Sequence, residues 1–177
     1  PGIGFGGPCL DKDLRALITV AGENSYDPVM FNGVLQRNEL QLREVMNKIT
    51  AAVGPSLYKK RIALLGLAFK EGTNDVRHSL SIRLYRALRD TGASVVGHDY
   101  LAAEEAVELE GGLTTTTDLS TALDSAEVVI VLNNEPSYRA LSPRDFGRNA
   151  FVLDTRGIVD AELFGSSGFV VDVIGKK

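Results

Sequence analysis

The chain has 177 residues, of which 44% are hydrophobic and 24% charged, and a formal net charge of −4, as expected for one globular domain with an appended piece. Its Lys and Arg residues are scattered, which argues against a nucleic-acid partner, and no apolar run approaches the ~20 residues that span a bilayer, which argues against a membrane partner. One cysteine and two histidines exclude an internal disulfide, disfavour a Cys/His zinc site and, with no secretory signal visible, favour the reducing cytoplasm.

The first part of the chain, residues 1–27, is a glycine-rich loop followed by a short predicted helix. The helix is expected to begin near Asp11, because apolar residues then recur at helical spacing and acidic residues favour the start of a helix. These apolar residues are Leu14, Leu17, Ile18 and Ala21. Since the chain begins with Pro1, inside its most motif-rich segment, we expect a processed or engineered piece of a longer protein.

The second part, residues 28–56, is dominated by one long helix predicted over Pro28–Val53. Pro28 suits a first helical turn, and Gly54-Pro55 ends the pattern. This helix is longer than the typical ~11 residues, so we expect it to form a spine between domains or subunits. Its apolar positions are Met30, Val34, Leu35, Leu42, Val45, Met46, Ile49 and Val53.

The third part, residues 57–177, alternates strands and helices. Its continuous apolar runs are typical of strands buried on both faces, and the alternation predicts an α/β fold with a doubly wound, mostly parallel, Rossmann-like sheet. Strands are predicted at Ile62–Leu67, Ser94–His98, Val128–Leu132, Phe151–Asp154 and Phe169–Val173, with a short one at Thr114–Thr117. Helices are predicted at Ser81–Thr91, Ala102–Glu110, Leu119–Ser125 and near Tyr138.

The segment Gly2–Gly7 matches the pattern GxGxxG of dinucleotide-binding folds. That pattern has meaning only between a strand and a helix of one βαβ unit. Here no strand precedes it, and Pro8-Cys9 follows. We therefore do not interpret it as a dinucleotide fingerprint.

Cys9 lies just after this loop and just before the first predicted helix. Backbone N–H groups and the helix dipole at such a place favour thiolate over thiol. Asp13 is one helical turn further on, so its carboxylate is expected on the same side, where it could activate water. A nucleophile and a carboxylate suit covalent catalysis followed by hydrolysis, although a lone cysteine is more often a small buried hydrophobe.

The segment Gly4–Asp13, which reads GFGGPCLDKD, closely resembles the GFGGxCxxKD motif of the UDP-glucose/GDP-mannose dehydrogenase family. The resemblance implies that Cys9 forms a thiohemiacetal and then a thioester with the sugar C6, and that Asp13 helps water to release the acid. It implies that Cys9 and Lys12 border the NAD cofactor. It also implies that the loop contacts the nucleotide sugar through Gly2, Ile3, Gly4, Phe5 and Gly6.

A second match covers Gly66–Ser79, which follows the family pattern GLxFKxxTxDxRxS. The resemblance implies that Phe69 and Lys70 contact the nucleotide sugar and that Arg77 reaches the cofactor. The loop after a first strand lies at the carboxyl edge of such a sheet, where ligands bind, and cations there suit a pyrophosphate. The competing interpretation is that Lys70 and Arg77 are solvated surface cations.

Further matches are weaker. Arg156 ends a D-[GT]-R pattern, which implies a substrate contact, and Asn38–Gln41 fits a family N-x-x-Q pattern that we interpret as structural. His98–Tyr100 stands where the family usually has Tyr-Asp-Pro, and Asn133-Asn134 also departs from the pattern. His98 is interpreted as a structural strand-end residue, and the departures put substrate preference in doubt.

The resemblance as a whole implies three regions: residues 1–27 as the end of a middle, dimerisation domain, 28–56 as a connecting helix, and 57–177 as a UDP-sugar-binding domain. The expected function is oxidation of UDP-glucose, or a related UDP- or GDP-hexose, to the uronic acid with NAD, by a homodimer paired through the long helix. The chain alone is expected to be inactive without an N-terminal NAD-binding domain. The alternatives are a non-catalytic nucleotide-sugar-binding or dimerisation module and, more weakly, a flavodoxin-like or CoA-binding domain.

Overall fold

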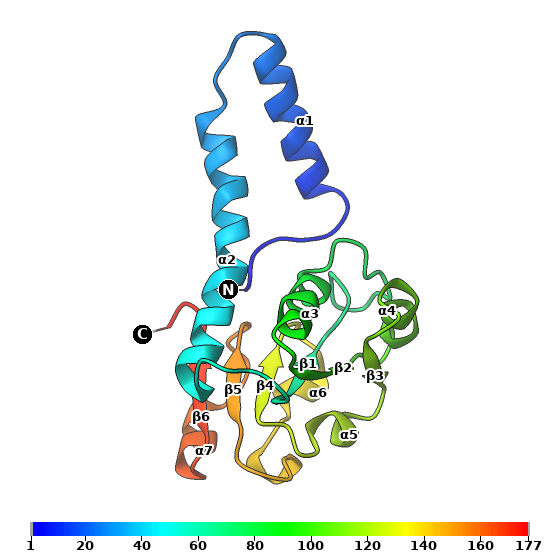
Figure 1. Ribbon diagram of the computed structural model, residues 1–177, viewed down its shortest axis with the longest axis vertical. Helices are drawn as coiled ribbons and strands as arrows, with labels where there is room; N and C mark the ends of the chain where they lie inside the picture. Colours follow the sequence, from blue (N-terminus) through cyan, green and yellow to red (C-terminus); the bar gives the residue numbers. More distant parts are fainter. Residues whose placement is uncertain (1, 177) are drawn as a thin grey trace.

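A computed structural model of the chain describes residues 2–176. Two helices, α1 (Leu10–Glu23) and α2 (Val29–Val53), form an antiparallel hairpin that projects from an α/β domain (Figure 1). The remaining elements build that domain around one sheet. Pro1 and Lys177, which the expected regions 1–27 and 57–177 include, lie outside the described residues.

The sheet has six strands in the order β3-β2-β1-β4-β5-β6, and every neighbouring pair is parallel. This is the doubly wound order, so the predicted fold class is confirmed. The chain reverses direction across the sheet between β1 and β4, and ligands of such sheets bind outside the carboxyl ends of the strands there. The strands are β1 (Arg61–Leu65), β2 (Ser94–His98), β3 (Thr114–Thr116), β4 (Val128–Val131), β5 (Phe151–Asp154) and β6 (Val170–Val173).

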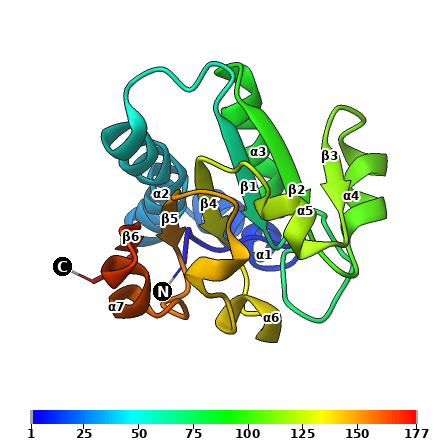
Figure 2. The ribbon, with the colours of Figure 1, turned by 90° about the horizontal axis from the view of Figure 1, so that it is seen from below.

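Helices cover both faces of the sheet (Figure 2). Ile62 and Leu64 of β1 face one hydrophobic cluster, which α2, α3 (Leu80–Asp90) and α4 (Ala103–Leu109) complete. Ala63 and Leu65 face the other cluster, which α5 (Leu119–Leu123), α6 (Pro136–Arg139) and α7 (Ala161–Ser166) complete. Alternate side chains of a strand point to opposite faces, so a strand in this position must be apolar throughout.

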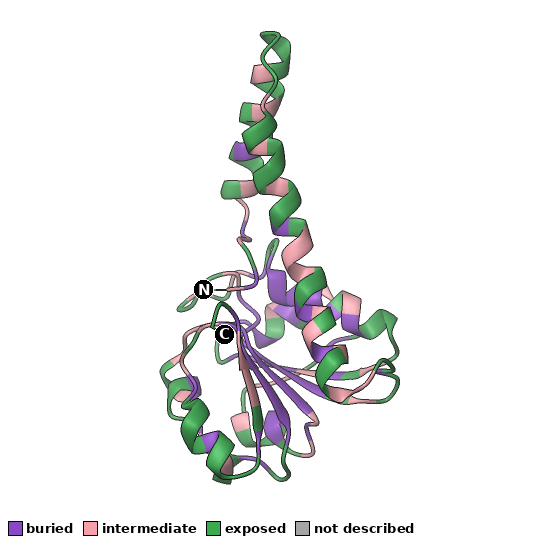
Figure 3. Cartoon of the chain, turned by 90° about the vertical axis from the view of Figure 1, so that its left-hand side faces the viewer, coloured by how far each residue is buried: buried purple, intermediate pink, exposed green. Residues whose placement is uncertain are grey.

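The long helix α2 has two different halves. Val45 and Ile49 of the carboxyl-terminal half are fully buried against the sheet, and Lys48 forms an ion pair with Asp172 of β6 at 2.6 Å. The amino-terminal half pairs with α1, and most of this hairpin is exposed (Figure 3). Among the described helices none is both long enough and apolar enough to cross a membrane.

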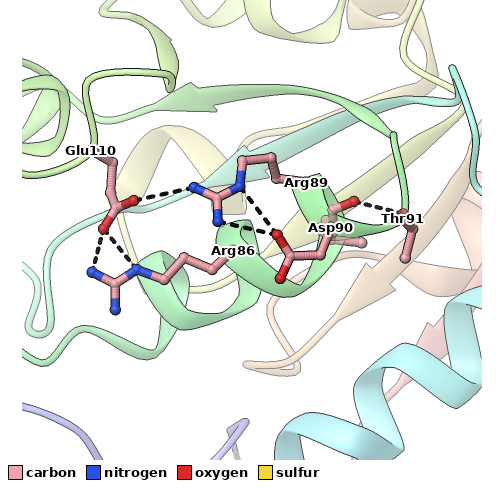
Figure 4. Close-up of polar contacts among 6 residues, drawn as sticks. Arg86, Arg89, Asp90, Thr91 and Glu110 are labelled. Atoms are coloured by element: carbon pink, nitrogen blue, oxygen red, sulfur yellow. Dashed lines mark hydrogen bonds and ion pairs between the residues drawn. The ribbon is translucent and has the colours of Figure 1, made fainter.

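A network of ion pairs joins α3 to the end of α4 (Figure 4). The carboxylate of Glu110, with a side chain only 10% exposed, accepts a hydrogen bond from Arg86 Nε at 2.7 Å and lies 3.7 Å from Arg89 Nη1. Arg89 also donates to Asp90, at 3.1 Å. These arginines are therefore engaged in holding two helices together.

Element bounds differ from the sequence-based expectation at a few places. α1 begins one residue earlier than expected, and β1 ends two residues before Leu67. α2 begins at Val29, so Pro28 occupies the position just before the helix instead of its first turn. The helix α7 and a 3₁₀ turn at Pro143–Asp145 were not predicted. α7 depends on the side chain of Asp160, which accepts the N–H groups of its first turn, rather than on an apolar period.

Candidate functional site

The glycine-rich loop before α1 lies at the carboxyl edge of the sheet, against the loop that follows β1. The N–H of Gly7 donates to the backbone oxygen of His78 at 3.1 Å. A Cβ on Gly6 would lie 2.6 Å from that same oxygen, and one on Gly7 would lie 2.6 Å from the Phe69 ring. Gly7 also has a φ of 85°, which favours glycine. The glycines therefore permit close contact between two loops distant in sequence.

Asn38 of α2 holds the same loop from the other side. Its Oδ1 accepts the N–H of Phe5 at 2.8 Å, and its Nδ2 donates to the Phe5 oxygen at 2.9 Å. Asn38 is buried, and the sequence pattern alone pointed only to a structural residue. A polar residue inside an apolar helical stripe was the available signal for this contact.

Cys9 is exposed and precedes the first residue of α1. Asp13 follows one turn later, since its N–H donates to the Cys9 oxygen at 2.9 Å. The side chains of Lys12 and Asp13 are 72% and 64% exposed and lie 3.3 Å apart. The expected nucleophile and carboxylate thus share the first turn of one helix, open to solvent, and no hydrogen bond joins their side chains within residues 2–176.

Arg77, the arginine expected to reach the cofactor, lies on the loop after β1. Its guanidinium pairs with Asp75, at 2.7 Å between Nη2 and Oδ2, while the arginine side chain stays 70% exposed. The hydrogen bond that the Arg77 guanidinium donates to Asp75 raises the pKa of Arg77, with a smaller contribution from Cys9. The same hydrogen bond lowers the pKa of the Asp75 carboxyl group. Arg77 is therefore held by Asp75 and remains accessible to solvent.

The carboxylate of Asp99 fixes the beginning of the loop after β1. Oδ2 accepts the N–H groups of Leu67 and Ala68 at 2.8 and 3.2 Å, and Oδ1 accepts those of Leu101 and Ala102 at 3.0 Å each. Backbone N–H groups of such a loop would otherwise be available to a phosphate. This role of Asp99 was not predicted from the sequence, where the residue stands within His98–Tyr100, a segment that departs from the family pattern.

Arg156 lies just after β5. Its Nε donates to the oxygen of Leu132 at 2.7 Å, and a Cβ on Gly2 would lie 3.2 Å from its Nη1. Arg156 thus meets the glycine-rich loop at the edge of the sheet. A small cavity of about 30 Å³ lies between them, lined by Ile3, Gly4, Gly6, Ala68, Phe69, Ser79, Leu80, Ser81, Leu132 and Arg156.

The structure thus brings together most of the expected substrate residues. Ile3, Gly4 and Gly6 meet Phe69 and Arg156 around this cavity. Gly2 lies beside Arg156, and Phe5 is anchored next to them. Lys70 is exposed and forms no ion pair within the part of the chain that the structure describes. Lys12 and Asp13 lie on the outer surface of α1, away from that cavity.

Two further features surround the site. A larger, mostly apolar hollow of about 620 Å³ lies along α2 beside the loop, lined by Gly2, Gly4, Phe5, Met30, Gly33, Val34, Arg37, Asn38 and Gln41. His98 is fully buried, and its Nδ1 lies 2.7 Å from the hydroxyl of Tyr138, as suits a structural residue. No cluster of three or more His, Cys, Asp or Glu residues suited to a metal occurs between residues 2 and 176.

Comparison with known proteins assigns both parts of the chain to one family. A sequence model described as the UDP-glucose/GDP-mannose dehydrogenase family, UDP binding domain, matches residues 63–161. A second, described as the central domain of the same family, matches residues 1–40. A UDP-glucose 6-dehydrogenase of Haloferax volcanii is 35% identical over 159 residues, which cover 89% of this chain and 36% of that protein.

Solved structures agree with this assignment. A UDP-glucose dehydrogenase from Pyrobaculum islandicum superposes with a TM-score of 0.82 at 32% identity, over 91% of this chain and 36% of that one. A GDP-mannose dehydrogenase from Pseudomonas aeruginosa superposes with a TM-score of 0.78 at 26% identity, over 90% of this chain and 38% of that one. The chain therefore spans well under half the length of the relatives it matches.

Proposed function

Because the chain belongs to the UDP-glucose/GDP-mannose dehydrogenase family, we propose that it supplies the nucleophile and the nucleotide-sugar site of an NAD-dependent 6-dehydrogenase, as the carboxyl-terminal part of a longer polypeptide. The substrate is UDP-glucose or a related UDP- or GDP-hexose, and the product is the uronic acid. The observation that carries the proposal is the exposed Cys9, which a glycine loop holds against the loop after β1 of a UDP-binding domain. The relatives' greater length supports a role within a longer chain.

The chemistry of this chain centres on Cys9 and Asp13. The thiolate of Cys9 adds to the C6 aldehyde and forms a thiohemiacetal, whose oxidation gives a thioester. Asp13, one turn along α1, accepts a proton from the water that attacks the thioester, which releases the acid and the free thiol. NAD⁺ supplies the hydride acceptor for the two oxidations when it is bound.

The residues that would meet this cofactor are Cys9, Lys12 and Arg77. Both cations are largely exposed, so both fit an anionic pyrophosphate that approaches from solvent. Most of the cofactor's contacts then belong to an N-terminal domain outside this sequence, and we propose that the chain alone is inactive.

The nucleotide sugar would meet the loop residues Gly2–Gly6, together with Phe69, Lys70 and Arg156. These residues lie at the carboxyl edge of the sheet near β1 and β4, where the chain reverses its direction across the sheet, the usual ligand position in doubly wound folds. Arg156 uses only Nε to hold Leu132, so the other guanidinium N–H groups can donate to a phosphate or sugar oxygen.

We propose the same three regions that the sequence indicated: 1–27 as the end of the middle domain, 28–56 as the connecting helix and 57–177 as the nucleotide-sugar domain. We further propose a homodimer paired through α2, whose amino-terminal half presents exposed apolar side chains. A reduced thiol and NAD are both available in the cytoplasm, where we place the reaction.

The test uses the longer dehydrogenase with NAD⁺ and UDP-glucose. Cys9→Ser should abolish uronic acid formation, because a serine hydroxyl is a far weaker nucleophile at neutral pH. Asp13→Asn should slow thioester hydrolysis, so that the sugar acyl group stays on Cys9. Mass measurement of the peptide that contains Cys9 should then find this group. Asp27→Asn, an exposed carboxylate between the two helices, is the matched control and should turn over normally. Normal acid production by Cys9→Ser would remove Cys9 from the mechanism.

A further inference from the structure

Asn38 is a buried polar residue in the middle of α2, only 8% exposed. Its side-chain amide pairs with both polar groups of Phe5, as a neighbouring strand would. The orientation of the amide is fixed, since a flip would set donor against donor and acceptor against acceptor. The buried amide of Asn38 therefore keeps both hydrogen bonds only while the loop stays in this one position.

The loop is shaped around that amide. Gly4 has a φ of 117°, a conformation that L side chains rarely adopt. A Cβ at this position would overlap Oδ1 of Asn38. Gly4 and Asn38 are thus one structural unit, in which the glycine makes room and the amide fills it.

Few other hydrogen bonds hold the loop, and its one deeply buried apolar side chain is that of Ile3. Within residues 2–176, three hydrogen bonds join the segment from Gly2 to Pro8 to the rest of the chain. Two are those of Asn38, and the third joins Gly7 to His78. Cys9 follows immediately, so its position depends on an upstream anchor on α2 and a downstream anchor on the loop after β1.

We propose that Asn38 is a positioning residue for Cys9, through which the long helix α2 sets the place of the nucleophile relative to the nucleotide-sugar domain. Loss of the upstream anchor leaves the Gly7–His78 hydrogen bond and the burial of Ile3, which together hold a segment with four glycines less firmly. The catalytic part of this role rests on the proposed function. The structural part, that the anchor at Phe5 controls Gly7 and Cys9, does not.

The structural part can be tested in the chain itself, because Cys9 is its one cysteine and takes a single nitroxide label. Asn38→Asp preserves size and replaces the donor with an oxygen that repels the Phe5 carbonyl. Gly4→Ala disrupts the same contact from the loop side. Asn47→Asp makes the same chemical change at an exposed position of the same helix and is the control.

Asn38→Asp and Gly4→Ala should each raise the hydrogen-exchange rate of the Gly7 amide at least tenfold. Each should also narrow the lines of the nitroxide spectrum at Cys9. The control should stay within twofold of the unchanged chain. Gly7 is not bonded to Asn38, so a role limited to satisfying the buried amide would leave Gly7 and Cys9 unaffected. Combining Asn38→Asp with Gly4→Ala should add little to either change, because both break one unit. Unchanged exchange at Gly7 and an unchanged label spectrum in a folded Asn38→Asp chain would overturn the proposal. If Asn38→Asp does not fold, Gly4→Ala decides by the same two readouts.

In the longer dehydrogenase, Asn38→Asp should lower kcat at least tenfold, and KM for the sugar nucleotide, which the same loop is proposed to contact, should rise by a smaller factor. A fall in binding alone would contradict positioning of the nucleophile. Should Cys9→Ser retain full activity, the proposed function fails, whereas the exchange and label measurements still decide whether Asn38 positions Cys9.

Discussion

The Nδ1 atom of His98 lies 2.7 Å from the hydroxyl oxygen of Tyr138, and both residues are fully buried at the carboxyl edge of the sheet. The tyrosine hydroxyl also donates to the backbone oxygen of His98 at 3.1 Å. The hydroxyl therefore lies between the imidazole Nδ1 and the backbone oxygen of His98. Burial lowers the pKa of His98 and raises that of Tyr138.

This pair predicts a loss of stability in mild acid. Because burial lowers its pKa, His98 takes up a proton less readily in the folded chain than in the unfolded chain, where it does so below its ordinary pKa of about 6.5. The free energy of unfolding should therefore fall as the pH drops from 7.5 to 5, by up to about 1.4 kcal/mol per unit below that pKa. Urea unfolding at several pH values measures it.

The other histidine is the control. His78 is exposed and has a φ of 53°, a conformation that asparagine tolerates, so His78→Asn should keep the pH dependence. His98→Gln should flatten it. The carboxyl groups with lowered pKa, such as Asp75 and Glu127, titrate below about pH 4.5 and do not obscure this window. An equal slope in the His98→Gln chain would show that another group is responsible.

The approach of the two loops predicts a strong effect of one methyl group at Gly7. Gly7→Ala forces a side chain into a positive φ and against the Phe69 ring, at a cost of about 1–2 kcal/mol for the backbone alone. The loop should open more often, so chymotrypsin should cleave after Phe5 about tenfold faster. Gly33→Ala, in the exposed interior of α2 with open space at its Cβ, should leave that rate unchanged and stabilise the helix.

Much of the fold could be predicted from the sequence, because buried parallel strands are continuous apolar runs between polar ends. The strands at Ser94–His98 and Phe151–Asp154 have the bounds that the sequence indicated. The helix α7 escaped prediction because Gly165 and the serines beside it dilute the apolar period.

The candidate site was predictable only where its residues are adjacent in sequence. The motif around Cys9 and the loop after β1 were visible as separate patterns. Their contact through Gly7 and His78 depends on how α2 returns the chain to the sheet. The pairing of Asn38 with Phe5 spans 33 residues and carries no local signal beyond one polar residue in an apolar stripe.

The ion pairs of Glu110 predict a local weakness between α3 and α4. Glu110→Gln removes the charge that two arginines share in a poorly exposed place, and should lower the free energy of unfolding by about 1–3 kcal/mol. Asp90→Asn removes an exposed partner of Arg89 and should have no measurable effect. Urea denaturation of both variants makes the comparison, and equal stabilities would show that the ion pairs of Glu110 contribute little to stability.

The exposed face of the α1–α2 hairpin predicts self-association. Leu17 and Val20 of α1 and Val29, Met30 and Val34 of α2 are all exposed, and the apolar hollow beside the glycine loop lies on the same helix. Apolar patches beyond a few hundred Å² are rare on monomers, and burying them contributes roughly 25 cal/mol per Å². A helix that presents one such face suits an isologous dimer.

Sedimentation at micromolar concentration should therefore find about twice the 19.0 kDa mass of the chain. Val34→Glu should shift the equilibrium to monomer, because it introduces a charge into the face that is to be buried. Val107→Glu is a closely matched control, since Val107 is 39% exposed on a helix and Val34 41%. Val107 lies on α4, away from the hairpin, so its variant should stay dimeric. A chain that sediments as a monomer at this concentration, or that loses its dimer equally with either variant, would mean that the hairpin face does not pair two copies.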